Sequence, residues 1–142
     1  MTTDREPMRF ESEHHVVVET ATRGVFRMVR HSTMFETVQD CEREFAGLLR
    51  WLAHRRTFAL LVDVRVARGR NDPAFETALA SGRRALFQRF TELACLVATL
   101  PGKMQLERYA REDGVAMQVF LREDEAERWL ADRQPALRSV AG

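Results

Sequence analysis

Two short runs of almost continuous apolar residues constrain the fold of this chain most. They are residues 58–64 (FALLVDV) and 93–100 (LACLVATL). Each run is far shorter than the roughly 20 residues that a membrane-spanning helix needs. Runs of this length are typical of strands buried on both faces, as in a parallel sheet. The chain is therefore predicted to build a sheet whose faces are covered by helices.

Segments with helical periodicity surround these two runs. Apolar residues spaced as on one helix face run from residue 38 to residue 52, and Thr33 with Glu36 matches a capping box. We therefore predict a first helix from about Met34 to residues 54–56. Asp72 followed by Pro73 predicts the start of a second helix. The apolar stripe of this second helix is Phe75, Leu79, Gly82, Leu86 and Phe90. The glycine on that stripe allows close approach to a neighbouring element.

The remaining segments complete an alternating pattern. Residues 16–20 and 25–30 are predicted to form a hairpin around Gly24. Residues 103–113 are a third predicted helix, closed by Gly114, and residues 115–121 a last strand. Asp124 opens a final helix that ends before Pro135.

The predicted fold class is α/β, with four helices and one mixed, mostly parallel sheet in the order ββαβαβαβα. The opening β-hairpin supplies one antiparallel edge strand. Residues 1–12 are predicted to be a flexible N-terminal arm, residues 13–134 the domain, and residues 135–142 a frayed C-terminal tail. The length of 142 residues suits one such domain.

Composition excludes several classes of function. With 22 basic and 21 acidic side chains the net charge is +1, so no basic field indicates nucleic acid. The first residues lack the pattern of a signal peptide, and no run is long enough for a transmembrane segment. Cys41 and Cys95 lie in apolar stretches without CxxC spacing, which predicts reduced thiols in a cytoplasmic protein. No nucleophile–base pattern is visible, so we expect no enzyme activity.

Metal and cofactor sites are not predicted either. His14 and His15 are adjacent on a predicted strand, so their side chains point to opposite faces and cannot share a metal ion. Glycine-rich phosphate-binding patterns are absent. Asp63, near the end of a buried strand, is a candidate functional carboxylate or, as we favour, a buried acceptor paired with a loop arginine.

Four segments carry a resemblance to a known family: residues 60–64 (LLVDV), 71–75 (NDPAF), 102–108 (GKMQLER) and 124–130 (DEAERWL). Over roughly residues 14–133 the chain resembles the STAS domain, and more closely the SpoIIAA-like (STAS/Sec14-type) bacterial proteins. The resemblance implies a small non-enzymatic module that docks a protein partner or holds a small ligand. In anti-sigma-factor antagonists of this kind a phosphorylatable Ser or Thr follows the third strand. Residues 66–73 here contain no hydroxyl side chain, so we do not carry over phosphorylation.

Three loops are expected to meet beyond the carboxyl ends of the strands: residues 31–33, 66–72 and 99–103. Helix N-termini at such an edge favour an anion, and arginine side chains add donors. The predicted partner- or anion-binding residues are His31, Arg68, Arg70, Asn71, Asp72 and Lys103. The competing interpretation is that these are solvated loop residues in an arginine-rich chain.

The sequence thus predicts a regulatory binding module that docks a protein partner through the loop at residues 68–72. The alternative is a carrier or sensor of a small apolar or anionic ligand, held between the helices and the sheet. A homodimer through the exposed edge of the hairpin is a further option.

Overall fold

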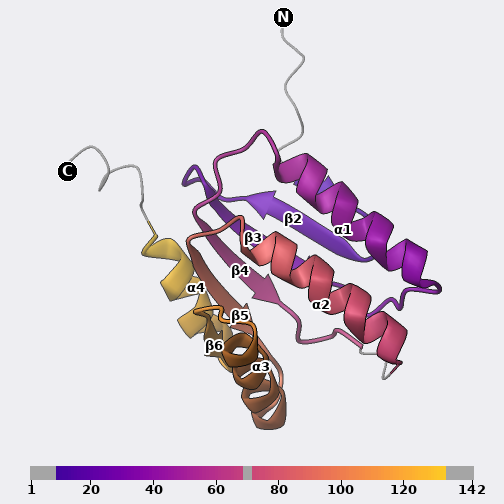
Figure 1. Cartoon of the computed structure of the whole chain (residues 1–142). Helices are drawn as coiled ribbons and strands as arrows, with labels where there is room; N and C mark the ends of the chain where they lie inside the picture. Colours follow the sequence, from indigo (N-terminus) through magenta and orange to yellow (C-terminus); the bar gives the residue numbers. More distant parts are fainter. Residues whose placement is uncertain (1–8, 69–71, 134–142) are drawn as a thin grey trace, which may run out of the picture.

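The computed structural model describes residues 9–68 and 72–133, which form one sheet with four helices (Figure 1). The strands are β1 (Arg9–Glu11), β2 (His15–Glu19), β3 (Val25–Arg30), β4 (Ala59–Asp63), β5 (Glu92–Leu96) and β6 (Gln118–Phe120). The helices are α1 (Val38–Leu52), α2 (Pro73–Phe87), α3 (Leu100–Glu112) and α4 (Glu123–Ala131). The predicted α/β class, with a mixed sheet and four helices, is confirmed.

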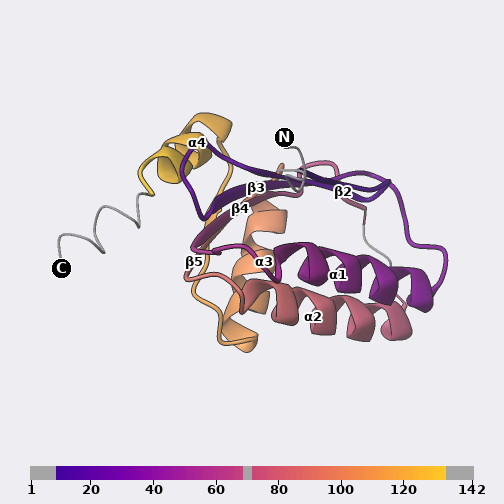
Figure 2. The ribbon, with the colours of Figure 1, turned by 90° about the horizontal axis from the view of Figure 1, so that it is seen from above.

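The sheet follows chain order from β1 to β6, and β3 to β6 are parallel. Each crossover therefore moves one strand further in the same direction. Because such connections are right-handed, they place their helices on the same face of the sheet. Figure 2 shows α1, α2 and α3 on one face and α4 on the other.

The predicted flexible arm is wrong for Arg9–Glu11, which form β1 and pair antiparallel with β2. Alternation explains the strand: Phe10 turns toward α1, its ring 6.2 Å from that of Trp51, while Arg9 and Glu11 are exposed. The antiparallel strand β2 is consequently not at the edge, and β1 covers the edge that we considered for a homodimer. Residues 1–8 and the predicted tail at 135–142 lie outside the described residues.

The start of α1 also differs from the prediction. Thr37, not Thr33, is the N-cap, and its hydroxyl accepts from Asp40 N at 3.0 Å while the Asp40 carboxylate accepts from Thr37 N. The Thr33 hydroxyl instead donates to the Glu13 carbonyl at 2.9 Å. This bond holds the loop before α1 in place, with Phe35 buried in the core. The helix therefore begins only at Val38.

Helix α3 begins at Leu100, before the predicted residue 103. The Thr99 hydroxyl accepts from Gly102 N at 3.1 Å, and Pro101 occupies the first turn, where its missing N–H costs nothing. The strand predicted over 93–100 therefore ends at Leu96. Gly114, with φ of +68°, follows the helix as predicted. The last strand is shorter than predicted, and α4 starts at Glu123 without a side-chain cap.

Apolar side chains form a core on each face of the sheet. The larger core lies under α1, α2 and α3, and a smaller one lies under α4, where Ala126, Trp129 and Leu130 are buried as predicted. In the larger core α1 and α2 pack closely, because Gly82 leaves room for the ring of Phe45. A side chain added at Gly82 would overlap that ring.

Candidate functional site

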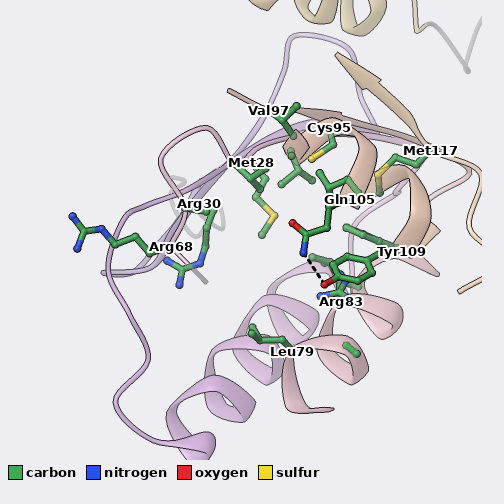
Figure 3. A pocket seen from close by; sticks show the side chains of 18 of the residues that line it. Met28, Arg30, Arg68, Leu79, Arg83, Cys95, Val97, Gln105, Tyr109 and Met117 are labelled. Atoms are coloured by element: carbon green, nitrogen blue, oxygen red, sulfur yellow. Dashed lines mark hydrogen bonds between the residues drawn. The ribbon is translucent and has the colours of Figure 1, made fainter. Parts of the chain in front are cut away.

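A cavity of about 680 Å³ lies on the helix-covered face, between the sheet, α2 and α3. Its floor is apolar and comes from neighbouring strands: Met28 on β3, Val62 on β4 and Cys95 on β5 all line it. Figure 3 shows Met28, Cys95, Val97 and Met117 around this space. The volume falls in the range of about 300–1,000 Å³ that is typical of small-molecule sites.

The walls of the cavity come from two helices. Leu79 and Arg83 on α2 face Gln105 and Tyr109 on α3 (Figure 3). The Gln105 amide donates to the Tyr109 hydroxyl at 2.9 Å, and the Arg83 guanidinium lies 5.4 Å from the Tyr109 ring centre. Large polar side chains therefore lie between α2 and α3. Between α1 and α2, by contrast, Gly82 allows the two helices to touch. The two interfaces of α2 differ for this reason.

A polar group of residues adjoins the cavity where β2 and β3 meet α1. We call His15, Arg30 and Glu44 the His15 corner. His15 and Arg30 are direct cross-strand partners, and both line the cavity. Glu44 extends from α1, and its Oε2 lies 2.6 Å from His15 Nδ1 and accepts from the Ser12 hydroxyl at 2.6 Å. The corner thus ties β2 to α1.

Burial and hydrogen bonding set the charge of the corner. Burial raises the pKa of Glu44, but the hydrogen bonds from His15 and Ser12 outweigh it and leave the pKa below its ordinary value. Burial lowers the pKa of His15 below 6.5 despite the neighbouring Glu44 carboxylate. At neutral pH Glu44 is therefore ionised and His15 is neutral. Because an ionised carboxylate can only accept, Nδ1 of His15 carries the ring proton.

Arg30 holds the adjoining loop. Its guanidinium donates to the backbone carbonyls of His31 at 2.7 Å and Thr33 at 2.8 Å, and it lies 4.9 Å from the centre of the Phe35 ring. Within the described part of the chain no carboxylate lies within ion-pair distance of Arg30. Burial lowers the pKa of Arg30, although the guanidinium stays charged. The half-buried Arg30 guanidinium therefore places a positive charge at the edge of the cavity.

The predicted site residues are only partly brought together. Arg68 is exposed and lines the cavity, whereas His31, Asp72 and Lys103 do not line it. Asp72 caps α2, its carboxylate accepting from Ala74 N at 3.1 Å, and Lys103 pairs with Glu107 at 3.3 Å. Arg70 and Asn71 lie outside the described residues.

The sequence analysis missed the His15 corner, although two signals point to it. A hairpin that turns at Gly24 places residue 15 opposite residue 30, which is the observed register. Glu44 lies between Cys41 and Leu48 on the apolar stripe of α1, where a carboxylate needs a buried partner. The prediction treated His14 and His15 only as possible metal ligands and did not combine these signals.

Asp63 behaves as the favoured interpretation predicts. Asp63 is only 7% exposed, and its carboxylate accepts from the backbone N of Arg65 at 3.0 Å and from the Arg65 guanidinium at 2.8 Å. Burial raises the pKa of Asp63, but these bonds outweigh burial and lower it. Arg65 also pairs with Glu123 at the start of α4. Asp63 is thus a structural acceptor that connects the sheet to α4.

No group of three His, Cys, Asp or Glu side chains in residues 9–68 and 72–133 is placed to hold a metal ion. None of the helices described is long and apolar enough to cross a membrane. Protein-family models, curated proteins and solved structures gave no match to the chain. The resemblance to STAS domains therefore stays a prediction from the sequence.

Proposed function

We propose that this protein is a carrier or sensor that holds a small, largely apolar molecule between its sheet and helices α2 and α3. The cavity of about 680 Å³ carries this proposal. Concave sites of about 300–1,000 Å³ that are lined mainly by apolar side chains are the usual binding sites of small molecules. Met28, Val62 and Val97 belong to the larger core and also line this cavity.

Reactive groups along the cavity do not favour chemistry on the ligand. Burial raises the pKa of the Cys95 thiol to about 12, so the thiol stays protonated. A protonated thiol is a poor nucleophile. The Tyr109 hydroxyl is engaged by Gln105. Binding without turnover is therefore the function we propose.

Native mass spectrometry of the purified protein, beside its denatured mass, tests the proposal. We expect extra mass that is lost on denaturation, or, for protein purified empty, a raised melting temperature with 1-decanol. Leu79→Trp should fill the cavity and abolish this response. Leu121→Trp, at a 40% exposed position that does not line the cavity, is the matched control. An unchanged response in Leu79→Trp would contradict the proposal.

Docking of a protein partner at the carboxyl ends of the parallel strands is the second candidate function. Met34, Val66 and Leu100 lie in segments that follow β3, β4 and β5, and each is more than 40% exposed. Large apolar side chains exposed together mark interaction surfaces. We expect Arg68→Glu with Arg70→Glu to abolish partner capture without lowering the melting temperature. Capture that is unchanged would count against this loop.

A further inference from the structure

The His15 corner contains a buried base with one unused nitrogen. His15 is 3% exposed, and its Nδ1 is held by Glu44 at 2.6 Å. No hydrogen bond of its Nε2 to any residue that the structure describes is found. Since His15 lines the cavity, Nε2 is the polar atom that this side chain can offer to a ligand. Nε2 is not among the fully buried atoms that lack a partner, which agrees with access to it from the cavity.

The protonation state of the corner defines what this atom can bind. With the ring proton on Nδ1 facing Glu44, Nε2 carries a lone pair and becomes a donor only when it takes up a second proton. Arg30 lies opposite His15 in the register, and its positive charge is balanced by Glu44. The corner is therefore neutral when His15 is neutral. A protonated His15 gives it one net positive charge, which one anion would balance.

We propose that the His15 corner binds the acidic head group of the ligand, an oxyanion on an apolar body, and that His15 takes up one proton from solvent as the oxyanion binds. The proposal rests on the proposed function, because it requires a ligand in the cavity. In the complex Nε2–H donates to the oxyanion, and Nδ1–H still donates to the Glu44 carboxylate. Charge balances, with Arg30 and His15 positive and Glu44 and the ligand negative.

Titratable and charged groups approach His15 from several elements. His14 precedes it in the chain, Arg30 faces it from β3, and Cys41 and Glu44 approach from α1. The charged residues on the cavity walls are Arg65, Arg68, Glu76, Arg83, Glu112 and Asp113. Arg83 lies 3.9 Å from Asp113, which partly offsets its charge. The apolar floor suits the body of the ligand, and the His15 corner suits its acid group.

Two probes of equal chain length test the proposal by isothermal titration calorimetry. Sodium 1-decanesulfonate stays anionic at every pH used, so any proton uptake belongs to the protein, and 1-decanol is its neutral match. We expect sulfonate affinity to rise by up to about tenfold per pH unit as the pH falls from about 7.5 to about 5.5. Titrations in two buffers of different ionisation enthalpy should show proton uptake approaching one per sulfonate bound. Decanol affinity should not change over this range.

Two variants assign the proton. His15→Gln should remove the pH dependence and the proton uptake for decanesulfonate while decanol binding persists, which also shows that the variant is folded. His14→Gln is the matched control, because His14 is also buried and adjacent but does not line the cavity. This control should keep both the pH dependence and the proton uptake. In the unsubstituted protein the imidazole pKa of His15, followed by NMR, should rise when decanesulfonate is added.

The outcomes separate this inference from the proposed function. Decanol binding together with pH-independent sulfonate binding, or with a pH dependence that survives His15→Gln, would overturn the inference and leave the carrier proposal standing. Absence of binding by both probes at every pH would overturn both. If His15→Gln does not fold, proton uptake and the NMR titration of the unsubstituted protein decide, and zero uptake overturns the inference.

Discussion

Helix α2 has two neighbours on the same face of the sheet, and it packs on them in opposite ways. Toward α1 it presents Gly82, against which the ring of Phe45 lies so closely that no side chain could be added. Toward α3 it presents Leu79 and Arg83, which line a cavity. We call the first interface the closed side of α2 and the second the open side.

This difference separates stability from binding within one helix. On the closed side a small residue lets two helices exclude solvent and gain close contacts. On the open side the Tyr109 and Gln105 side chains hold a hydrogen bond to each other at 2.9 Å and leave volume behind. The closed side is therefore expected to be intolerant of added atoms, and the open side tolerant.

The largest effect is expected from Gly82→Leu on the closed side. The added side chain would force Phe45 and α1 away, so we expect the free energy of unfolding to fall by about 3 kcal/mol or more. Urea denaturation followed by circular dichroism measures this change.

A glycine of α1 supplies the control. At Gly47 an added Cβ would lie 3.8 Å from the Phe10 ring, which is ordinary contact, so Gly47→Ala should raise the free energy of unfolding by about 0.5–1 kcal/mol. Equal effects at Gly82 and Gly47 would show that the closed side is not closely packed.

Acid should next weaken the contact between β2 and α1, through the His15 corner. The pKa of His15 in the folded protein lies below 6.5 because of burial, so the unfolded chain binds a proton first as the pH falls. Stability from His15 is therefore complete above about pH 6.5 and falls below it by up to about 1 kcal/mol per pH unit. Glu44 adds a further loss below its ordinary value of 4.5.

Urea denaturation at a series of pH values measures this dependence. The variant His15→Gln should show a flatter profile between about pH 6.5 and about pH 5, and His14→Gln should keep the original slope. A His15→Gln profile as steep as that of the unsubstituted protein would assign the acid sensitivity to other groups.

Much of the closed side could be predicted from the sequence, because local patterns determine it. The sequence shows the apolar stripes of α1 and α2 and the glycine at position 82. It also shows the Asp72–Pro73 start of α2. The capping box was misplaced because Thr33 and Thr37 are each followed three residues later by an acidic residue. Only the tertiary bond from Thr33 to Glu13 decides between them.

The open side could not be predicted, because a cavity is the absence of a contact between segments that are distant in the sequence. Leu79 and Leu106 look like core residues whether α3 packs on α2 or stands away from it. The polar side chains of Gln105 and Tyr109 on α3 were the available signal, since Tyr109 bonds to Gln105 and its ring lies beside Arg83. Strand β1 was missed because its three residues are too few for an alternating pattern to be recognised.

Atoms added on the open side should do little harm. Ala80 is half-buried on α2 and lines the cavity, so Ala80→Leu places its new methyl groups in empty volume. We expect the free energy of unfolding to stay unchanged or to rise by up to about 1 kcal/mol. Differential scanning calorimetry of the empty protein tests this expectation. A destabilisation like that of Gly82→Leu would mean that the cavity is closed by packing in solution.

The smallest effect is expected where α2 and α3 meet through charges. Asp113 lies 3.9 Å from Arg83 and 3.6 Å from Arg84, and Arg84 is half-exposed. Because solvent screens such pairs, Asp113→Asn should lower the free energy of unfolding by less than about 1 kcal/mol, and salt should reduce the difference further. Thermal denaturation at low and high ionic strength measures both effects. If Asp113 instead holds α3 against α2, the loss would exceed this value and would persist in high salt, and the open side would then depend on this charge cluster.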